Sequence, residues 1–265
     1  LSFLQIAMVG CLVGAYLSSL ERMSGKILLL SASVLTGIFM AVFGQIYQTG
    51  ADAYQLFMMW SLLILGWTLI SNFAPQWILW LVINNIFLLL WWEQGAEKDM
   101  EIMIFTYLAV LNGGVLLEKD MEIIIFTYLA VLNGGVLLLR EYFFTDQTKE
   151  WMRPKWIRVF LTIAVLLPMF ISIIVSIASE SWSLSASIAV IGHGLMFTFY
   201  RFKMKDMWSL TIVIFSVCIL LLSFLFIRWF GFDSLFVLGI ISLIIFITAA
   251  IYLHKIKNIL EVDHV

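Results

Sequence analysis

Charge is almost absent from two long stretches of the sequence. Asp52 is the only Asp, Glu, Lys or Arg between residues 27 and 92, and Glu180 is the only one between residues 159 and 200. Over the whole chain 12% of the residues are charged and 63% are hydrophobic, whereas about a quarter of the residues in a soluble domain are charged. The sequence therefore predicts an all-α fold, a polytopic bundle of transmembrane helices.

Apolar runs long enough to cross a membrane recur along the chain. A transmembrane helix needs about 20 mainly apolar residues, and charges, Pro or Gly clusters and Trp or Tyr residues bound each run, as is typical of membrane interfaces. The runs predict nine to ten spans, at Phe3–Leu20, Ile27–Phe43, Leu56–Ser71, Trp77–Trp92, Ile102–Leu117, Ile123–Leu139, Ile157–Ala178, Leu184–Tyr200, Met207–Phe230 and Leu235–His254.

A tandem repeat lies in the middle of the chain. Residues 97–117 read EKDMEIMIFTYLAVLNGGVLL, and residues 118–138 differ from them only in having Ile124 where the first copy has Met103. At about 1.5 Å of rise per residue, each copy makes about 31 Å of helix, enough for one crossing of a hydrocarbon core of about 30 Å. Ancient transporter repeats diverge in sequence, so this near identity indicates a recent duplication, an engineered insertion or a sequence-assembly artefact.

Basic residues between the runs indicate which loops face the cytoplasm, since cytoplasmic loops are rich in Lys and Arg. If one repeat copy is left out of the crossings, nine spans place every Lys and Arg except Lys98, Lys119 and Arg228 on one side. If both copies cross and the second half of the chain keeps its orientation, the first half is inverted. The separation of basic residues between the two sides is then only slightly worse than with nine spans. Both topologies predict a cytoplasmic C-terminus.

The chain divides into four parts on this basis. Residues 1–92 hold N-terminal membrane helices and the GQIYQTGAD segment, residues 93–139 hold the repeat, residues 140–158 form a cytoplasmic connector, and residues 159–265 hold the C-terminal helices and a short tail. In the connector, Arg140–Arg158, basic residues beside Trp151 and Trp156 suit anionic lipid headgroups. A solvated connector without a ligand is the simpler interpretation.

The segment FGQIYQTGADAYQLF, residues 43–57, is unusually polar for its surroundings. Polar groups in lipid need partners or a water-filled cavity. One interpretation is a half-helix site for a small polar solute or cation; the other is a polar connector between two spans. On a continuous helix one face would carry Gln45, Gln48, Thr49, Asp52 and Gln55, with Tyr47 and Tyr54 beside it, whereas Gly44 and Gly50 could break the helix. The binding candidates in this segment are Gln45, Tyr47, Gln48 and Asp52.

The same segment carries a family resemblance. GQIYQTGADAYQLF is followed by MMWSLLILGW and PQWILWLVINNIFLLLWW, and over roughly residues 3–92 the chain resembles the bacterial predicted-membrane-protein family known as domain of unknown function 2157. The family usually begins with a cytoplasmic segment and an earlier helix, so the resemblance implies that this chain starts partway into the pattern, with Leu1 outside the cytoplasm. It implies the bacterial inner membrane, but it brings no established activity, and the tandem copy departs from the family pattern.

Two further residues inside the runs are candidates for function. His193 lies between Gly192 and Gly194, and an ionisable group within a membrane is a functional candidate by default. The plainer interpretation is a neutral histidine that hydrogen-bonds to another helix. Pro168 removes a backbone donor from the middle of its run and predicts either a hinge or a static bend.

Other polar and small residues predict helix packing rather than chemistry. Steps of two small residues four apart allow close backbone approach, at Gly10/Gly14, Ser33/Gly37, Ser172/Ser176 and Ser185/Ala189. Interhelical hydrogen bonds are expected at Asn84, Asn85, Asn112 and Asn133, and Glu180 and Asp233 are expected to be solvated in short loops.

Several function classes are excluded or weakened by the sequence. The net charge of −2 offers no basic surface for nucleic acid. The two cysteines, Cys11 and Cys218, lie inside apolar runs and predict neither a disulfide framework nor a zinc site. The chain contains no GxxxxGK[ST], HExxH, GxSxG or paired CxxC motif. We therefore expect no catalytic residues, no metal and no cofactor.

Three hypotheses remain. The first is a transporter or permease for a small polar solute or cation, with Gln45, Gln48, Asp52 and His193 along a polar path. The second is a non-catalytic scaffold or subunit of a cell-envelope complex, in which polar groups fasten helices and an unknown protein partner carries the activity. The third, a lipid-modifying enzyme, ranks last because ionisable residues within the membrane are too few. The dense polar segment favours the first slightly.

Overall fold

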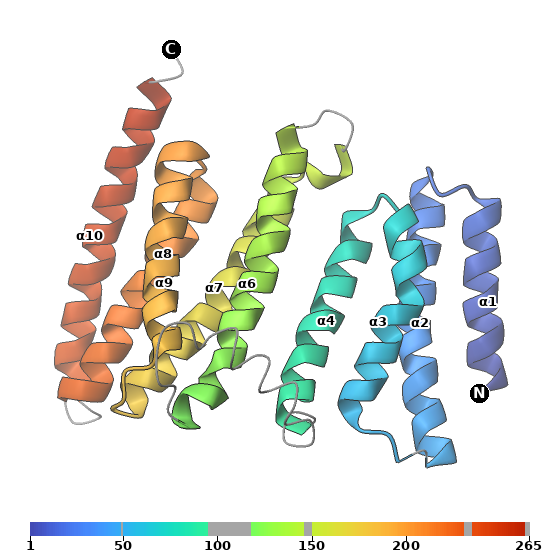
Figure 1. The fold of residues 1–265 in the computed structure, drawn as a ribbon. Coiled ribbons are helices and arrows are strands. Elements are labelled where there is room, and N and C mark those ends of the chain that lie inside the picture. The colour runs from blue at the N-terminus through green and yellow to red at the C-terminus, as the bar shows by residue number, and fades with distance from the viewer. Residues whose placement is uncertain (49, 95–117, 146–149, 231–234, 263–265) are drawn as a thin grey trace. The chain divides into compact units, whose positions relative to one another are not determined.

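The protein is helical throughout the part that the structure describes. This computed structural model describes all residues except 49, 95–117, 146–149, 231–234 and 263–265 (Figure 1). The α-helices are α1 (Ser2–Leu17), α2 (Met23–Tyr47), α3 (Ala53–Ile70), α4 (Ala74–Gln94), α6 (Glu118–Thr145), α7 (Lys155–Ala178), α8 (Leu184–Thr198), α9 (Met207–Leu225) and α10 (Leu235–Val262). A 3-10 turn, η1 (Glu150–Met152), and two π-helical turns, η2 (Phe199–Lys203) and η3 (Phe226–Phe230), complete the elements.

The chain forms two compact units. The first consists of residues 1–114 with residues 143–153, and the second of residues 115–142 with residues 154–265. The first unit therefore contains α1 to α4 and η1, and the second contains the greater part of α6 with α7 to α10.

In the first unit, each helix packs against the next one in sequence: α1 against α2, α2 against α3, and α3 against α4 (Figure 1). The turns between them are short, and each contains a residue in the left-handed backbone region, namely Ser19, Gln48 and Asn72. This conformation reverses the chain within a few residues, because a right-handed helix cannot continue through it. The result is a row of antiparallel hairpins.

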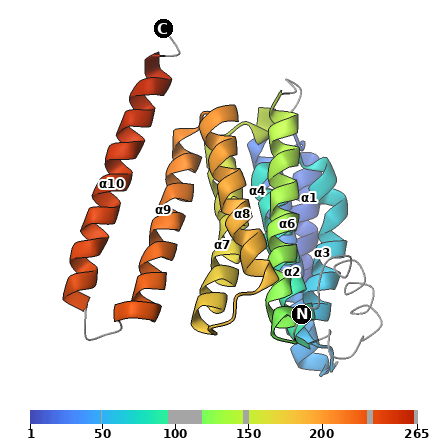
Figure 2. The ribbon, with the colours of Figure 1, turned by 60° about the vertical axis from the view of Figure 1, so that its left-hand side comes forward.

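In the second unit, α7 is the central helix. It packs against both α8 and α9, and α9 packs in turn against α10 (Figure 2). The apolar core between α7 and α8 includes Ile173, Ile177, Ala186 and Ala189. The small residues on α8 allow close approach to α7, as small residues do between membrane helices. The helix α7 is continuous through Pro168, which is buried.

Membrane-spanning dimensions are met by six of the nine α-helices in the described part of the chain. These are α2, α3, α4, α7, α9 with most of η3, and α10. Helix α1 is apolar but has 16 residues, and α8 has 15 before it widens into the π-helical turn η2. The second repeat copy forms part of α6, whereas the run Ile102–Leu117 and the first copy lie outside the described residues. A multi-pass helical membrane protein is thus supported, while the count of nine to ten spans is not confirmed.

Candidate functional site

The polar segment of residues 43–57 forms the turn between α2 and α3. Helix α2 passes through Gly44 and ends at Tyr47, and Gln48 follows with φ 45° and ψ 49°. Gly50, at φ 65°, also adopts the left-handed conformation that glycine tolerates. Helix α3 begins after Asp52, whose carbonyl oxygen accepts a hydrogen bond of 3.1 Å from the Gln55 amide. Gln45, Gln48, Asp52 and Gln55 therefore do not lie on one continuous helix, and Thr49 is outside the described residues.

The same turn nevertheless brings two of the sequence candidates to one pocket. Gln45 of α2 and Asp52 line a pocket of about 600 Å³, together with Gln55 and apolar side chains of both helices. Tyr47 is 60% exposed and packs on the ring of Phe43, with ring centroids 4.5 Å apart. Gln48 is exposed at the helix end. The pocket is therefore an open, mainly apolar recess with one carboxylate and two amides at its wall.

A buried hydrogen-bond network joins α2, α3 and α4. Its centre is Ser33, which is fully buried on α2. The Ser33 hydroxyl accepts hydrogen bonds from Trp67 Nε1 and from Gln76 Nε2, both at 2.7 Å, and Trp60 Nε1 donates to the Ser33 carbonyl oxygen at 2.8 Å. Gln76 also donates to Thr68 Oγ1 at 3.0 Å. We call Ser33, Trp60, Trp67, Thr68 and Gln76 the Ser33 network.

The Ser33 network satisfies most of its buried groups internally. The hydroxyls of Ser33 and Thr68 donate to carbonyl oxygens one turn back in their own helices, at 3.0 and 2.8 Å. Gln76 is fully buried, and its Oε1 has no hydrogen-bond partner in the structure. Polar groups shared among three helices in this way hold the helices in one register, because each lost partner leaves a costly buried donor.

His193 performs a similar fastening role in the second unit. It is 5% exposed on α8, and its two ring nitrogens lie 2.9 Å from the Ala189 carbonyl oxygen and 3.1 Å from Ser216 Oγ on α9. Both nitrogens therefore have partners, one in the same helix and one in the neighbouring helix. His193 and the α2–α3 turn belong to different units.

The asparagines divide between helix–helix and local contacts. Ser61 on α3 donates to Asn84 Oδ1 on α4 at 3.2 Å, which is an interhelical bond of the expected kind. The Nδ2 groups of Asn85 and Asn133 donate to carbonyl oxygens four residues back in their own helices, at 2.8 Å in each case. Asn112 lies outside the described residues.

A buried ionic cluster ties α6 to α7 and α9. Glu141 is 8% exposed and accepts two hydrogen bonds from Arg158, at 2.8 Å from Nε and 3.0 Å from a terminal nitrogen. Arg140, 3% exposed, also donates to Glu141. Arg158 in turn lies 3.5 Å from Asp206, the residue before α9. Two guanidinium groups and two carboxylates thus balance one another, as buried charges must.

Hydrogen bonds of neutral side chains extend this ionic cluster. Tyr200, fully buried in η2, shares a 2.6 Å hydrogen bond with Thr162 of α7. Asp206 caps α9 by accepting a 3.0 Å bond from the Ser209 amide. A carboxylate is favourable at a helix N-terminus, where backbone amides lack partners. The cluster therefore fixes the ends of α6, α7 and α9 together.

A surface ion pair links two loops elsewhere in the second unit. Arg228 in η3 donates to Glu180, in the turn after α7, over 2.6 Å. The Glu180 side chain is 78% exposed, so this carboxylate is solvated, as the sequence predicted. It also forms an ion pair with Arg228. Asp233 lies outside the described residues.

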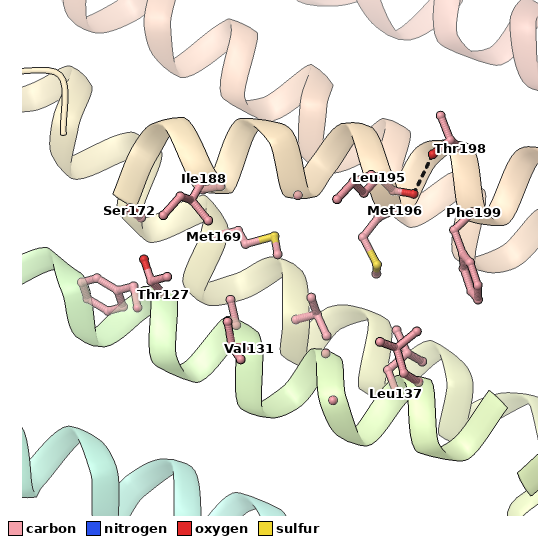
Figure 3. Close-up of a pocket in the computed structure, with 18 of the residues that line it drawn as sticks. Thr127, Val131, Leu137, Met169, Ser172, Ile188, Leu195, Met196, Thr198 and Phe199 are labelled. Atoms are coloured by element: carbon pink, nitrogen blue, oxygen red, sulfur yellow. Dashed lines mark hydrogen bonds between the residues drawn. The ribbon is translucent and has the colours of Figure 1, made fainter. Parts of the chain in front are cut away.

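A mainly apolar cavity of about 730 Å³ lies between α6, α7 and α8. Figure 3 shows Val131 and Leu137 of α6 on one side, Leu195 and Met196 of α8 on the other, and Met169 of α7 between them. Nearly all the atoms that line it are carbon or sulfur. Such a lining cannot orient a polar substrate, but it can accommodate hydrocarbon.

The basic residues of the connector differ in their exposure. Arg140 and Arg158, the ends of that range, are buried and ion-paired with Glu141. Among the connector residues that the structure describes, Arg153 and Lys155 are the exposed basic ones. Trp151 packs in the first unit against Trp77, with stacked rings 6.0 Å between centroids.

Sequence reasoning missed the residues that build these contacts. Ser33 and Gly37 stood out only as a small-residue step, and Gln76 appeared only in the string PQWILWLVINNIFLLLWW, just before the run Trp77–Trp92. Asp206, three residues before Ser209 at the start of an apolar run, does have the spacing of a helix N-cap. No sequence signal pairs Glu141 with Arg158, because their proximity depends on how α6 and α7 pack.

The described residues contain no group of three or more His, Cys, Asp or Glu side chains placed to hold a metal ion. No curated protein and no solved structure gives a significant match to the chain. Residues 1–77 match the model of the family described as "Predicted membrane protein (DUF2157)". These residues include α1 to α3, the α2–α3 turn and every member of the Ser33 network. The resemblance inferred from the sequence is thus confirmed over residues 1–77, which are similar to this family of predicted membrane proteins.

Proposed function

We propose that the protein is a non-catalytic, multi-pass membrane scaffold, a subunit that presents a fixed helix bundle to a partner in the cell envelope. The observation that carries this proposal is the use of buried polar side chains to join helices. The Ser33 network joins α2, α3 and α4, His193 joins α8 to α9, and Glu141 joins α6 to α7. These groups bond to the protein itself, as in a bundle whose polar residues serve packing.

The proposed setting is the bacterial inner membrane with a cytoplasmic C-terminus. Positive charge between the apolar runs supports this orientation, and nine crossings give the better separation of charge. The basic residue that stands apart in the C-terminal half, Arg228, is paired with Glu180, which lowers the cost of placing it on the opposite side. Exposed Arg153 and Lys155 are the residues through which the connector would contact anionic headgroups.

Transport of a small polar solute or cation is the second candidate. It is favoured by the α2–α3 pocket, where Gln45, Asp52 and Gln55 share one wall. In that case Asp52 would carry the charge that attracts the cation, and Tyr47 and Gln48 would lie at the exposed rim. His193 would need a polar connection to this turn, and Pro168 would be the hinge.

Flux through reconstituted protein separates these two functions. Proteoliposomes containing the full chain, its Asp52→Asn variant or no protein would be loaded with pH-sensitive and cation-sensitive dyes. The scaffold proposal predicts the same proton, sodium and potassium flux in all three. Flux that requires the protein and disappears in Asp52→Asn would instead establish the transport function.

A further inference from the structure

The cavity between α6, α7 and α8 is shaped by missing side chains. Gly134 and Gly135 lie on its α6 wall and Gly192 on its α8 wall. A Cβ atom added at Gly134 or Gly135 would meet no atom within 4 Å, so the space beside this part of α6 is open. At one end, the hydroxyls of Thr127 and Ser185 are joined by a 2.9 Å hydrogen bond between α6 and α8.

An apolar cavity of about 730 Å³ requires an occupant. Protein interiors are close-packed, and atoms that line a void lose dispersion contacts. Water does not fill a space of this kind favourably, because each molecule needs two to four polar partners. Within a membrane the available filler is hydrocarbon, which makes the same contacts as an apolar side chain.

The length of the cavity fits one leaflet of a bilayer. Its α6 wall extends from Phe126 to Leu138, and at about 1.5 Å per residue this is about 18 Å of helix. One leaflet contributes half of a hydrocarbon core of about 30 Å. An acyl chain lying along α6 would therefore reach from the membrane surface to about the bilayer midplane.

The charged end of the cavity indicates the headgroup. Lys203, in η2, is exposed and lines the cavity, and Phe199, the first residue of η2, lies at the end of the cavity where Leu137 is found (Figure 3). The Lys203 Nζ lies 5.9 Å from the centre of the Phe199 ring, which is a cation–π distance, and the Lys203 side chain remains exposed. Arg201 is in the same π-helical turn. Basic residues at a membrane surface attract anionic lipids.

We propose that this cavity binds one acyl chain of an anionic phospholipid, with the lipid phosphate held at Lys203. Burial alone does not select the chain, since the bilayer is as apolar as the cavity. Selection comes from the open space beside Gly134 and Gly135 and from the charge of Lys203. The site is separate from the α2–α3 turn and does not depend on the scaffold function.

Native mass spectrometry of the full-length protein tests this site. The protein would be reconstituted with equal amounts of phosphatidylglycerol and phosphatidylcholine, extracted in detergent and examined for retained lipid. We expect one phosphatidylglycerol per chain. Gly134→Leu, whose added side chain fills the cavity, should lose the bound phosphatidylglycerol. Lys203→Gln should keep a lipid but lower the preference for phosphatidylglycerol about fivefold, equivalent to about 1 kcal/mol for one basic residue at the surface.

Two control variants match these changes. Gly239→Leu adds the same side chain to α10 where a Cβ meets no atom within 4 Å, and Lys255→Gln removes an exposed charge from α10. Both should retain lipid as the unaltered protein does. Equal retention of lipid by Gly134→Leu and Gly239→Leu would overturn the site. A change in the oligomeric state of Gly134→Leu would also overturn it, because it would indicate that a second copy of the chain occupies the cavity. Equal retention of the two lipids by the unaltered protein would overturn headgroup recognition.

Discussion

Single polar residues in this protein derive their importance from the medium around them. A hydroxyl or amide that loses its partner in water is resolvated, but within a membrane it has only protein groups to bond with. Ser33 illustrates this, because one hydroxyl accepts from both Trp67 and Gln76. Its position between three helices could not be predicted from the sequence, since serine is common in membrane helices as a small packing residue.

Ser33→Ala should lower the free energy of unfolding by about 1 to 3 kcal/mol, because the substitution leaves buried donors on Trp67 and Gln76 without their acceptor. Thermal or denaturant unfolding in detergent measures this loss. Ser31→Ala is the matched control, since the Ser31 hydroxyl bonds to the Ile27 carbonyl oxygen of its own helix. Equal stability of the two variants would show that the Ser33 network does not stabilise the fold.

Glu141→Gln should destabilise the protein by about 3 to 5 kcal/mol, because it removes the buried carboxylate that the guanidinium groups of Arg140 and Arg158 share. The matched control is Glu180→Gln at the exposed pair with Arg228, where a surface ion pair contributes about 0 to 1 kcal/mol. The two changes in unfolding free energy are compared directly. A similar small effect at both positions would contradict the buried cluster.

At the scale of the helices, the sequence predicted type and approximate position well and contacts poorly. Apolar runs are set by composition, so α2, α7 and α10 lie where runs were expected. Their ends depend on single backbone conformations: α2 continues through Gly44 and stops only where Gln48 turns left-handed. The small-residue step at Ser33 and Gly37 predicted close backbone approach, and in the structure the Trp60 ring fills the space above Gly37.

Gly37→Ala should disturb the packing of α2 against α3, since an added Cβ would overlap the Trp60 ring, whose Nε1 is held on the Ser33 carbonyl oxygen. Overpacking of this kind costs about 1 to 3 kcal/mol. Gly66→Ala, whose Cβ would meet no atom within 4 Å, should be neutral or stabilising by up to about 1 kcal/mol through helix propensity. In detergent, the melting temperature of Gly37→Ala should therefore fall, whereas that of Gly66→Ala should stay the same or rise. An unchanged melting temperature for Gly37→Ala would contradict this packing.

For the whole molecule, composition predicted the class of protein and left the function open. Six described helices have the length and apolar character to span a membrane, which supports the multi-pass architecture. The number of crossings turns on the tandem repeat, because two nearly identical segments have the same propensity to insert. Local sequence cannot decide between them, since insertion of one copy depends on the helices around it.

Cysteine accessibility at the loops tests the number of crossings. In a chain lacking Cys11 and Cys218, single cysteines at positions 48 and 181 should react with a membrane-impermeant maleimide from the same side. This result is expected because nine effective crossings place both loops opposite the cytoplasm. Labelling from opposite sides would show that both repeat copies cross.

A scaffold of the proposed kind has no water-filled path through its helix bundle. Gln76 and His193 are buried among bonded helices, so a path for polar solutes should not reach either position. The most direct measurement is labelling of single cysteines at positions 76 and 193, with position 48 as an exposed reference, by small water-soluble thiol reagents in intact membranes. The scaffold proposal predicts labelling at position 48 alone. Rapid labelling at position 76 or 193 would reveal a water-filled path and would contradict the scaffold proposal.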